Sequence, residues 1–234
     1  MPDKIILLSG ASAVGKTAVL KLLVPLLKSK SVVPAVCKID CIHTEDDRTY
    51  EKLGVKYVIG LSGDICPDHF LVSNLPELWG WSNEQNADWL FIETAGLCHR
   101  CSPATQKMIS GCILDCTSSC HAPSGFGPML SQADFVVLTK IDMLSQAERE
   151  IIVWKIKELN STAEIFMVDG LTGYGIEPLI SWLLLQPNIK SFENDCLRHT
   201  MPSGVCSYCV GETRVGSDYQ QGMVAKIQFK EERE

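Results

Sequence analysis

The feature that most constrains this chain is a glycine-rich stretch near its N-terminus, Gly10-Ala-Ser-Ala-Val-Gly-Lys-Thr17, which fits the pattern G-x4-G-K-[ST]. It lies between a short apolar run at Lys4–Leu8 and a helical pattern at Ala18–Leu27, so the sequence predicts a strand, a phosphate loop and a helix. In such a loop the backbone N–H groups surround the β-phosphate, the lysine reaches the β- and γ-phosphates, and the threonine hydroxyl binds Mg²⁺. The loop residues expected to bind nucleotide are Gly10, Ala13, Val14, Gly15, Lys16 and Thr17.

Beyond the loop, short apolar runs alternate with helical stretches, which is typical of a mostly parallel sheet covered by helices. The apolar runs are Val32–Ile39, Lys56–Ile59, Trp89–Ile92, Cys112–Cys116, Phe135–Leu138 and Ile165–Val168, and the helical stretches are His69–Leu78, Gln146–Leu159 and Ile176–Leu185. The predicted fold class is α/β, a three-layer P-loop nucleoside-triphosphatase fold. Pro25 is expected to disturb the end of the first helix.

The alternation stops after Pro187, and the rest of the chain is polar and contains three cysteines. We therefore expect residues 1–186 to form the nucleotide-binding domain and residues 187–234 to form a small Cys-containing C-terminal module, with a possible strand at Met223–Phe229. A chain of 234 residues with 46% hydrophobic content can bury one substantial core.

The charge balance argues against nucleic acid as a partner. The chain has 21 Lys and Arg against 28 Asp and Glu, a formal net charge of −7, and no run of basic residues. No stretch is long and apolar enough to cross a bilayer, and Met1–Gly10 lacks the features of a signal peptide. A cytoplasmic protein without membrane partners is expected, so its 11 cysteines are candidates for burial, metal binding or redox chemistry.

Two later segments complete the expected nucleotide site. The apolar run Trp89–Ile92 leads into Glu93-Thr-Ala-Gly96, which places a carboxylate near the Mg²⁺ and a backbone N–H near the γ-phosphate. The run Phe135–Leu138 leads into Thr139-Lys-Ile-Asp142, where the aspartate can accept hydrogen bonds from guanine and the lysine stem can pack on the base. Thr139, Lys140 and Asp142 are therefore expected to contribute to nucleotide binding, and Asp142 favours GTP over ATP.

Taken in order, these motifs resemble the metallochaperone branch of the P-loop GTPases, which includes HypB, UreG and the more distant CobW-type proteins. The resemblance covers roughly residues 4–186, including Asp40 to Arg48, which is similar to the switch I pattern of HypB. It implies that Asp40 approaches the Mg²⁺ or the attacking water, and that Lys16, Asp40 and Glu93 serve hydrolysis. It also implies a homodimer and a client metalloenzyme as partners.

The same resemblance implies a site for a transition metal. Cys66-Pro-Asp-His69 is similar to the segment that is Cys-His in HypB and Cys-Pro-His in UreG, with one residue more than UreG has between the ligands. A soft thiolate and an imidazole select Ni²⁺ or Zn²⁺ over Mg²⁺. Two ligands do not complete a site, so a two-fold dimer would bring Cys66 and His69 from both subunits together. Burial of Cys66 with a helix-capping His69 is the alternative.

Two further cysteine groups have the spacing of metal ligands. Cys98-His-Arg-Cys101 begins two residues after Gly96, so Cys98, His99 and Cys101 are candidate ligands in the segment most sensitive to the γ-phosphate. In the tail, Cys196, His199, Cys206 and Cys209 form two pairs whose compact spacing suits tetrahedral Zn²⁺. An Fe–S cluster in the tail and a disordered tail with incidental cysteines remain alternatives.

The other cysteines are assigned with less support from spacing. Cys37, Cys112 and Cys116 lie in or beside apolar runs, and burial in the core is expected for them. Cys120 and His121 lie beyond the apolar run, and both metal binding and a structural role remain open for them.

The sequence therefore predicts a GTP-binding and GTP-hydrolysing metallochaperone whose ligands are GTP or GDP, Mg²⁺, and a transition metal such as nickel, zinc or cobalt. Two alternatives remain open. One is an ATP-dependent reductive activator that contains an Fe–S cluster, and the other is a metal-responsive binding module that does not hydrolyse nucleotide.

Overall fold

The computed structural model describes residues 2–96, 101–119, 121–199, 211–220 and 222–229. Cys98, His99, Cys120, Cys206 and Cys209, which the sequence made candidates for metal binding, lie outside these residues. None of the helices in the described ranges is long and apolar enough to cross a membrane.

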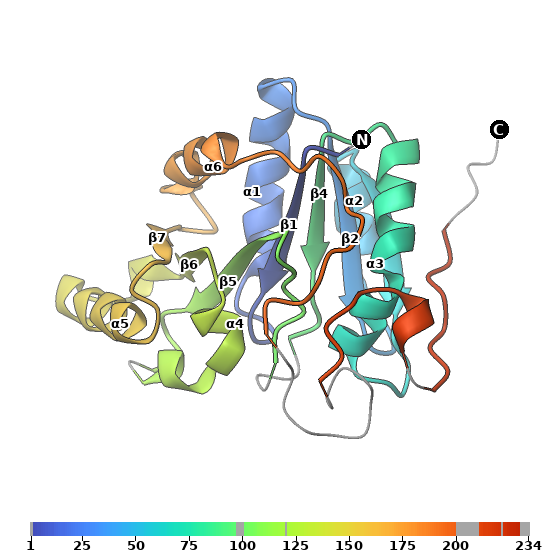
Figure 1. Cartoon of the computed structure of the whole chain (residues 1–234). Coiled ribbons are helices and arrows are strands. Elements are labelled where there is room, and N and C mark those ends of the chain that lie inside the picture. The colour runs from blue at the N-terminus through green and yellow to red at the C-terminus, as the bar shows by residue number, and fades with distance from the viewer. Residues whose placement is uncertain (1, 97–100, 120, 200–210, 221, 230–234) are drawn as a thin grey trace.

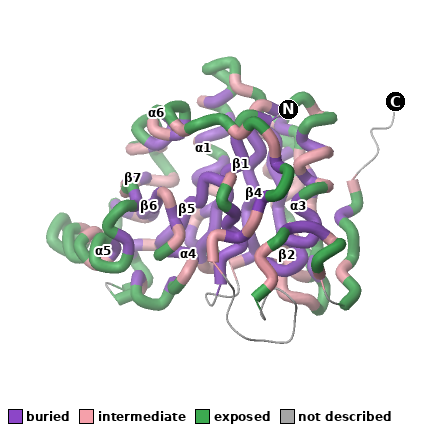
Figure 2. The backbone as a smooth tube through the Cα atoms, viewed as in Figure 1, coloured by how far each residue is buried: buried purple, intermediate pink, exposed green. Residues whose placement is uncertain are grey.

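A sheet of seven parallel strands forms the centre of the described structure, in the order β3-β2-β4-β1-β5-β6-β7 (Figure 1). Its strands are β1 (Lys4–Ser9), β2 (Pro34–Asp40), β3 (Lys56–Leu61), β4 (Trp89–Glu93), β5 (Ile109–Asp115), β6 (Phe135–Thr139) and β7 (Glu164–Met167). Each predicted apolar run corresponds to one of these strands, which confirms the α/β class and the parallel sheet. Strands β1, β4 and β6 are buried along their whole length (Figure 2), as expected for a sheet covered on both faces.

Helices cover both faces of the sheet, which gives three layers (Figure 1). They are α1 (Lys16–Ser29), α2 (Asp47–Lys52), α3 (Pro67–Glu84), α4 (Gly127–Ser131), α5 (Gln146–Leu159) and α6 (Ile176–Leu185), with 3-10 turns at Ala122–Gly125, Ile141–Met143 and Ser217–Tyr219. Alternate residues of a strand point to opposite faces: Ile6 packs with α1 and α6, whereas Ile5 packs with α3. Helices α4 and α5 cover β5 and β6 on the second face.

Helix α1 continues through Pro25 to Ser29, so the expected disturbance at this proline is wrong. Proline lacks the N–H that would bond to the preceding turn. Buried Leu23, Val24 and Leu27 flank Pro25, and their packing against the sheet stabilises the helix on both sides of it.

The predicted strand at Met223–Phe229 is also wrong, because these residues form no strand. They lie beside α3, where the side chain of Asn74 donates to the carbonyl of Ala225 (3.1 Å) and accepts from the amide of Ile227 (3.0 Å). The Asn74 side chain thus satisfies backbone groups that a neighbouring strand would otherwise satisfy. Ile227 is buried and Phe229 stacks on Trp81.

The chain after α6 crosses the sheet and returns beside α3, in orange to red in Figure 1. Phe192, Leu197, Val215 and Ile227 belong to the same hydrophobic cluster as the inner face of α3. The described parts of residues 187–229 therefore pack on the core of the nucleotide-binding domain. The division of the chain at residue 187 stays a prediction.

Arg198 holds this segment to the sheet. Its guanidinium donates two hydrogen bonds to the carboxylate of Asp134, at 2.9 and 2.7 Å, and others to the carbonyls of Thr105, Gln132 and Met108. Planar, two-pronged donation of this kind is specific to arginine and stronger than a neutral hydrogen bond. The segment is therefore fixed beside β5 and β6.

We predict that Arg198→Met lowers the free energy of unfolding by about 2–3 kcal/mol, because it leaves several acceptors without their charged donor. Urea unfolding followed by circular dichroism measures the change. Arg214→Met is the matched control: Arg214 lies in the same segment, but its side chain is 60% exposed in its pair with Glu212, so its removal should change stability by less than about 0.5 kcal/mol. Equal effects of the two substitutions would contradict the conclusion that Arg198 holds this segment to the sheet.

Candidate functional site

The loop between β1 and α1 has the backbone conformation of a phosphate loop. Gly10, Ala13 and Gly15 have positive φ angles of 143°, 60° and 101°, which turn the chain sharply before the N-terminus of α1. A Cβ atom on Gly10 would lie 2.3 Å from the carbonyl oxygen of Ile113 on β5, so no side chain fits there. The backbone of the loop and the positive end of the α1 dipole thus converge on the same place, as anion binding requires.

Lys16 begins α1 and is buried. Its ammonium donates to the carbonyl oxygens of Gly10 (2.9 Å) and Ala11 (2.7 Å) of the loop. Burial lowers the pKa of Lys16 to about 8, against the attraction of Glu93, which raises it. The lysine is therefore positioned at the loop, and an anion bound there would favour its charged form.

Gly96 lies directly against this loop. Its φ angle is 76°, and a Cβ atom there would lie 2.1 Å from the carbonyl oxygen of Gly10 and 3.0 Å from Nζ of Lys16. Only a glycine permits this approach. The contact agrees with the expected role of the Gly96 backbone at the terminal phosphate.

A cluster of polar side chains lies at the carboxyl ends of β2 and β4, next to Thr17. The Thr17 hydroxyl donates to Oε1 of Glu93 (2.8 Å) and contacts Oδ2 of Asp46 (3.4 Å). Lys38 Nζ forms ion pairs with the same two carboxylates, at 3.1 Å from Asp46 Oδ2 and in direct contact with Glu93 Oε1. Tyr50 donates to the other oxygen of Glu93 (2.8 Å).

The sheet register explains why these residues meet. Glu93 on β4 is in register with Leu8 on β1 and with Lys38 on β2, so the carboxylate lies between the strand that leads into the phosphate loop and the strand that carries the lysine. Glu93 is 1% exposed and Lys38 is 6% exposed. Burial would lower the pKa of Lys38, but Glu93 and Asp46 hold it above the ordinary value of lysine.

The oxygen atoms of Thr17, Glu93 and Asp46 are hard ligands that suit Mg²⁺. Asp46 was not predicted, since the resemblance directed attention to Asp40. The Asp40 carboxylate accepts from the amide of Cys41 (2.9 Å) and raises the pKa of Lys16. No described contact joins it to Thr17.

At the other side of the loop, Thr139 fixes the phosphate loop to β6. Its hydroxyl contacts the carbonyl oxygens of Val14 (2.7 Å) and Leu114 (3.2 Å). The next residue, Lys140, has a φ angle of 55° and pairs with Asp115. Burial would raise the pKa of Asp115, but hydrogen bonds from Lys140 and Thr117 hold it below its ordinary value. Asp142 is exposed in the following 3-10 turn, where a base could reach it.

The structure places the Cys66–His69 segment at the start of α3. Cys66 precedes the first turn of the helix, and Asp68 contacts the thiol of Cys101 (3.2 Å). Burial raises the pKa of Asp68 to about 6, although the Cys101 contact lowers it. Asp68 is the residue that this sequence has in addition to the Cys-Pro-His pattern. Its contact thus brings the Cys66–His69 segment and Cys101 together.

His69 is buried rather than directed to the surface. Burial lowers its pKa, and a hydrogen bond with Gln220 of the C-terminal segment raises it. Gln220 also contacts the hydroxyl of Ser73 one turn along α3 (3.2 Å). In the described residues no three His, Cys, Asp or Glu side chains are close enough together to hold a metal ion.

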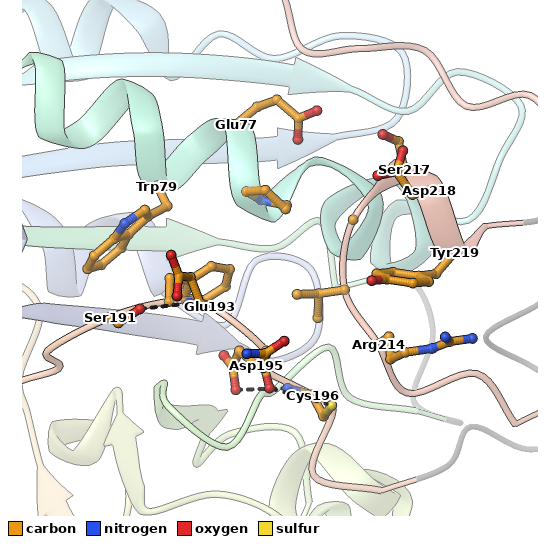
Figure 3. A pocket seen from close by; sticks show the side chains of 15 residues that line it. Glu77, Trp79, Ser191, Glu193, Asp195, Cys196, Arg214, Ser217, Asp218 and Tyr219 are labelled. Atoms are coloured by element: carbon orange, nitrogen blue, oxygen red, sulfur yellow. Dashed lines mark hydrogen bonds between the residues drawn. The ribbon is translucent and has the colours of Figure 1, made fainter.

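In the tail, Cys196 and His199 are half-buried. Cys196 lies opposite Arg214, and Leu197 lies opposite Thr105, so this segment runs beside the chain that follows Cys101. Cys196 also lines a cleft of about 730 Å³. Glu77 and Trp79 of α3 line this cleft together with Arg214 and Tyr219 (Figure 3).

Cys37, Cys112 and Cys116 are buried, which confirms their assignment to the core. Burial raises the pKa of Cys112 to about 12 and that of Cys116 to about 11, so neither is a ready thiolate. His121 contacts Lys155 of α5 through Nδ1 (2.8 Å).

Comparison with known proteins gives a consistent result. Residues 4–167 match the model of the CobW/HypB/UreG nucleotide-binding domain. An uncharacterized protein of Methanocaldococcus jannaschii is 43% identical over 224 residues, 96% of each chain. The urease accessory protein UreG of Yersinia pestis is 25% identical over 192 residues, 76% of this chain and 86% of that one. The structure of HypB from Helicobacter pylori in complex with nickel has a similar fold, with a TM-score of 0.63 and 18% identity, over 77% of this chain and 85% of that chain.

We predict that GDP binding weakens as the pH rises from about 7 to about 9. The phosphates attract only protonated Lys16, and the pKa of Lys16 in the free protein is about 8, so at about pH 9 roughly a tenth of it carries the proton. Bound phosphate raises that pKa, so binding takes up a proton and the affinity should fall about tenfold. Calorimetric titration in buffers of different ionisation enthalpy measures both quantities. A GDP affinity that stays constant over this pH range, without proton uptake, would contradict the assignment of Lys16 to the phosphates.

Proposed function

Because the chain belongs to the CobW/HypB/UreG family of nucleotide-binding proteins, we propose that it is a GTPase that controls the binding and delivery of a transition metal. The delivery would serve the maturation of a client metalloenzyme, and nickel, zinc and cobalt are the metals considered. The observation that carries this proposal is the contact of Thr17 with Glu93 and Asp46 at 2.8 and 3.4 Å, beside a loop against which Gly96 packs.

In this proposal the phosphate end of the nucleotide lies at the loop. The backbone from Gly10 to Thr17 surrounds the phosphates and Lys16 neutralises them. Thr17 and Glu93, together with Asp46, would hold Mg²⁺, which would neutralise the negative charge that develops on the phosphates. Asp40 lies close enough to Lys16 to affect its charge and is the candidate for orienting the attacking water.

The base lies at the opposite side of the loop, beside Lys140 and Asp142. Asp142 accepts hydrogen bonds from guanine N1 and the exocyclic amine, which gives the preference for GTP. The ion pair of Lys140 with Asp115 keeps the lysine stem in a fixed direction for packing on the base. Turnover is expected to be slow, because no arginine is assigned to the terminal phosphate.

The metal to be delivered is bound by thiolate and imidazole ligands. Cys66, His69, Cys98, His99 and Cys101 are the candidates, and ligands from two subunits of a homodimer would complete the coordination. The contact of Asp68 with Cys101 (3.2 Å) supports the association of the two cysteine segments. His69 is buried, so its ring must become accessible if it is to bind metal.

The tail is proposed as a second metal site. Cys196, His199, Cys206 and Cys209 have spacing suited to Zn²⁺, with an Fe–S cluster as the alternative. Because Thr105 is bridged to Leu197, such a site would lie near the chain that follows Cys101.

We predict that Cys66→Ala and Cys98→Ala each weaken Ni²⁺ binding by more than about tenfold in the presence of a GTP analogue, since each removes a soft ligand. Wild-type protein should take up Ni²⁺ and dimerise with the GTP analogue, and less so with GDP. Mass spectrometry under native conditions and size-exclusion chromatography measure metal content and dimer formation.

Cys116→Ala and Cys196→Ala are the controls for this experiment. Cys116 is a buried core thiol, so its loss should leave metal uptake unchanged, whereas Cys196→Ala should affect only a tail site. A metal content that does not change with the bound nucleotide, with Cys66→Ala or with Cys98→Ala would overturn the proposed cargo site.

A further inference from the structure

Two carboxylate oxygens in the nucleotide site are shared by a hydroxyl and an ammonium group. Oε1 of Glu93 contacts both Thr17 Oγ1 and Lys38 Nζ. Oδ2 of Asp46 likewise contacts both groups, at 3.4 and 3.1 Å. The four groups form a closed arrangement in which each oxygen serves two partners.

The ammonium has a clear electrostatic role in this arrangement. Two carboxylates that converge on one hydroxyl repel each other, and Glu93 is almost completely buried, so a positive charge between them is required. Lys38 is the cation found there, and it is in register with Glu93 on the neighbouring strand. The Tyr50 hydroxyl holds the second oxygen of Glu93 at 2.8 Å and thereby fixes the direction of the carboxylate.

The same oxygens are the proposed ligands of a divalent cation. Mg²⁺ binds oxygen at about 2.1 Å with octahedral geometry, and Thr17 is the residue that the phosphate-loop motif assigns to it. An ammonium in contact with both carboxylates would be repelled strongly by a doubly charged ion on the same atoms. Lys38 and Mg²⁺ therefore cannot use these oxygens together in the geometry observed.

We infer that Lys38 is a built-in competitor of the divalent cation, and that binding of Mg²⁺ displaces its ammonium from Glu93 and Asp46. The displaced charge stays near the phosphate loop, since Lys38 already influences Lys16 electrostatically. It can then contact the terminal phosphate, the position for which no arginine is assigned. This inference rests on the proposed nucleotide site and is independent of the transition metal.

Displacement of Lys38 would also change the surroundings of α2. Asp46 precedes the first residue of that helix and Tyr50 lies within it. One of the two carboxylates and the hydroxyl that binds the other therefore belong to this short helix or to the residue before it. Exchange of a lysine for a metal ion at one pair of oxygens thereby gives the segment after β2 a means to respond to nucleotide.

The test is the Mg²⁺ dependence of nucleotide binding in Lys38→Met, with Lys21→Met as the matched control. Lys21 is an exposed lysine of α1. A fluorescent GDP analogue is titrated with Mg²⁺, and Mn²⁺ binding without nucleotide is measured by electron paramagnetic resonance. We expect the half-saturating concentration of either ion to fall about tenfold in Lys38→Met and to stay unchanged in Lys21→Met. Lys38→Met should unfold at a lower temperature without a divalent cation, and Mg²⁺ should raise that temperature more than in the wild type.

Lys38→Arg keeps the test informative if Lys38→Met does not fold. A guanidinium can hold both carboxylates at once, so it should raise the half-saturating Mg²⁺ concentration several-fold. An unchanged or higher Mg²⁺ requirement in folded Lys38→Met overturns the inference, as does an unchanged requirement in Lys38→Arg when only that variant folds. Failure of the wild type to bind nucleotide would instead overturn the proposed function, and the two failures are therefore distinguishable.

Discussion

The structure around the nucleotide site depends on one buried charge, the carboxylate of Glu93. It is 1% exposed, and an isolated carboxylate in such a place would be protonated or would destabilise the fold. Thr17, Lys38 and Tyr50 all contact it, and they come from α1, β2 and α2. The partners of one side chain thus connect the phosphate loop, two neighbouring strands and the short helix after β2. A change in the charge near Glu93 would therefore affect all of these elements.

The sheet order extends this connection toward the cysteine segments. Strand β4 lies between β1 and β2, so its end, Glu93, is central, and Gly96 can reach the loop. The chain after Cys101 runs beside the C-terminal segment, where Gln106 donates to the carbonyl of Cys196 (2.9 Å) and Arg198 donates to that of Ala104 (2.9 Å). Cys101 also contacts Asp68 at the start of α3. Contiguous described contacts thus join three segments that contain candidate metal ligands.

The sequence was sufficient for the features that depend on local pattern. The phosphate loop, the seven apolar runs and the burial of Cys37, Cys112 and Cys116 were all predicted, because period, spacing and apolar content are local properties. Met223–Phe229 shows the limit of this reasoning. Val224, Ile227 and Phe229 do pack on the core, but the backbone partner of the segment is the Asn74 side chain, which no pattern within the segment indicates.

The site contacts that the sequence missed join residues that are distant in the chain. Asp46, Lys38 and Tyr50 meet Glu93 only because β2 and β4 are neighbours in a particular register. Lys38, which interrupts the apolar run at the start of Pro34–Asp40, was an available signal, since a buried lysine needs a partner. Likewise, the contact of His69 with Gln220 joins residues far apart in the chain, and the sequence offered only the choice between a metal ligand and a structural histidine.

The central claim is that nucleotide state and transition-metal binding are coupled. The direct measurement is the Ni²⁺ affinity of the wild-type protein saturated with a GTP analogue or with GDP, together with the affinity for each nucleotide with and without Ni²⁺. The account predicts that Ni²⁺ binds at least about fivefold more tightly with the GTP analogue, and that Ni²⁺ changes the ratio of the two nucleotide affinities by the same factor, as linkage requires. Equal Ni²⁺ affinity in the two nucleotide states would contradict it.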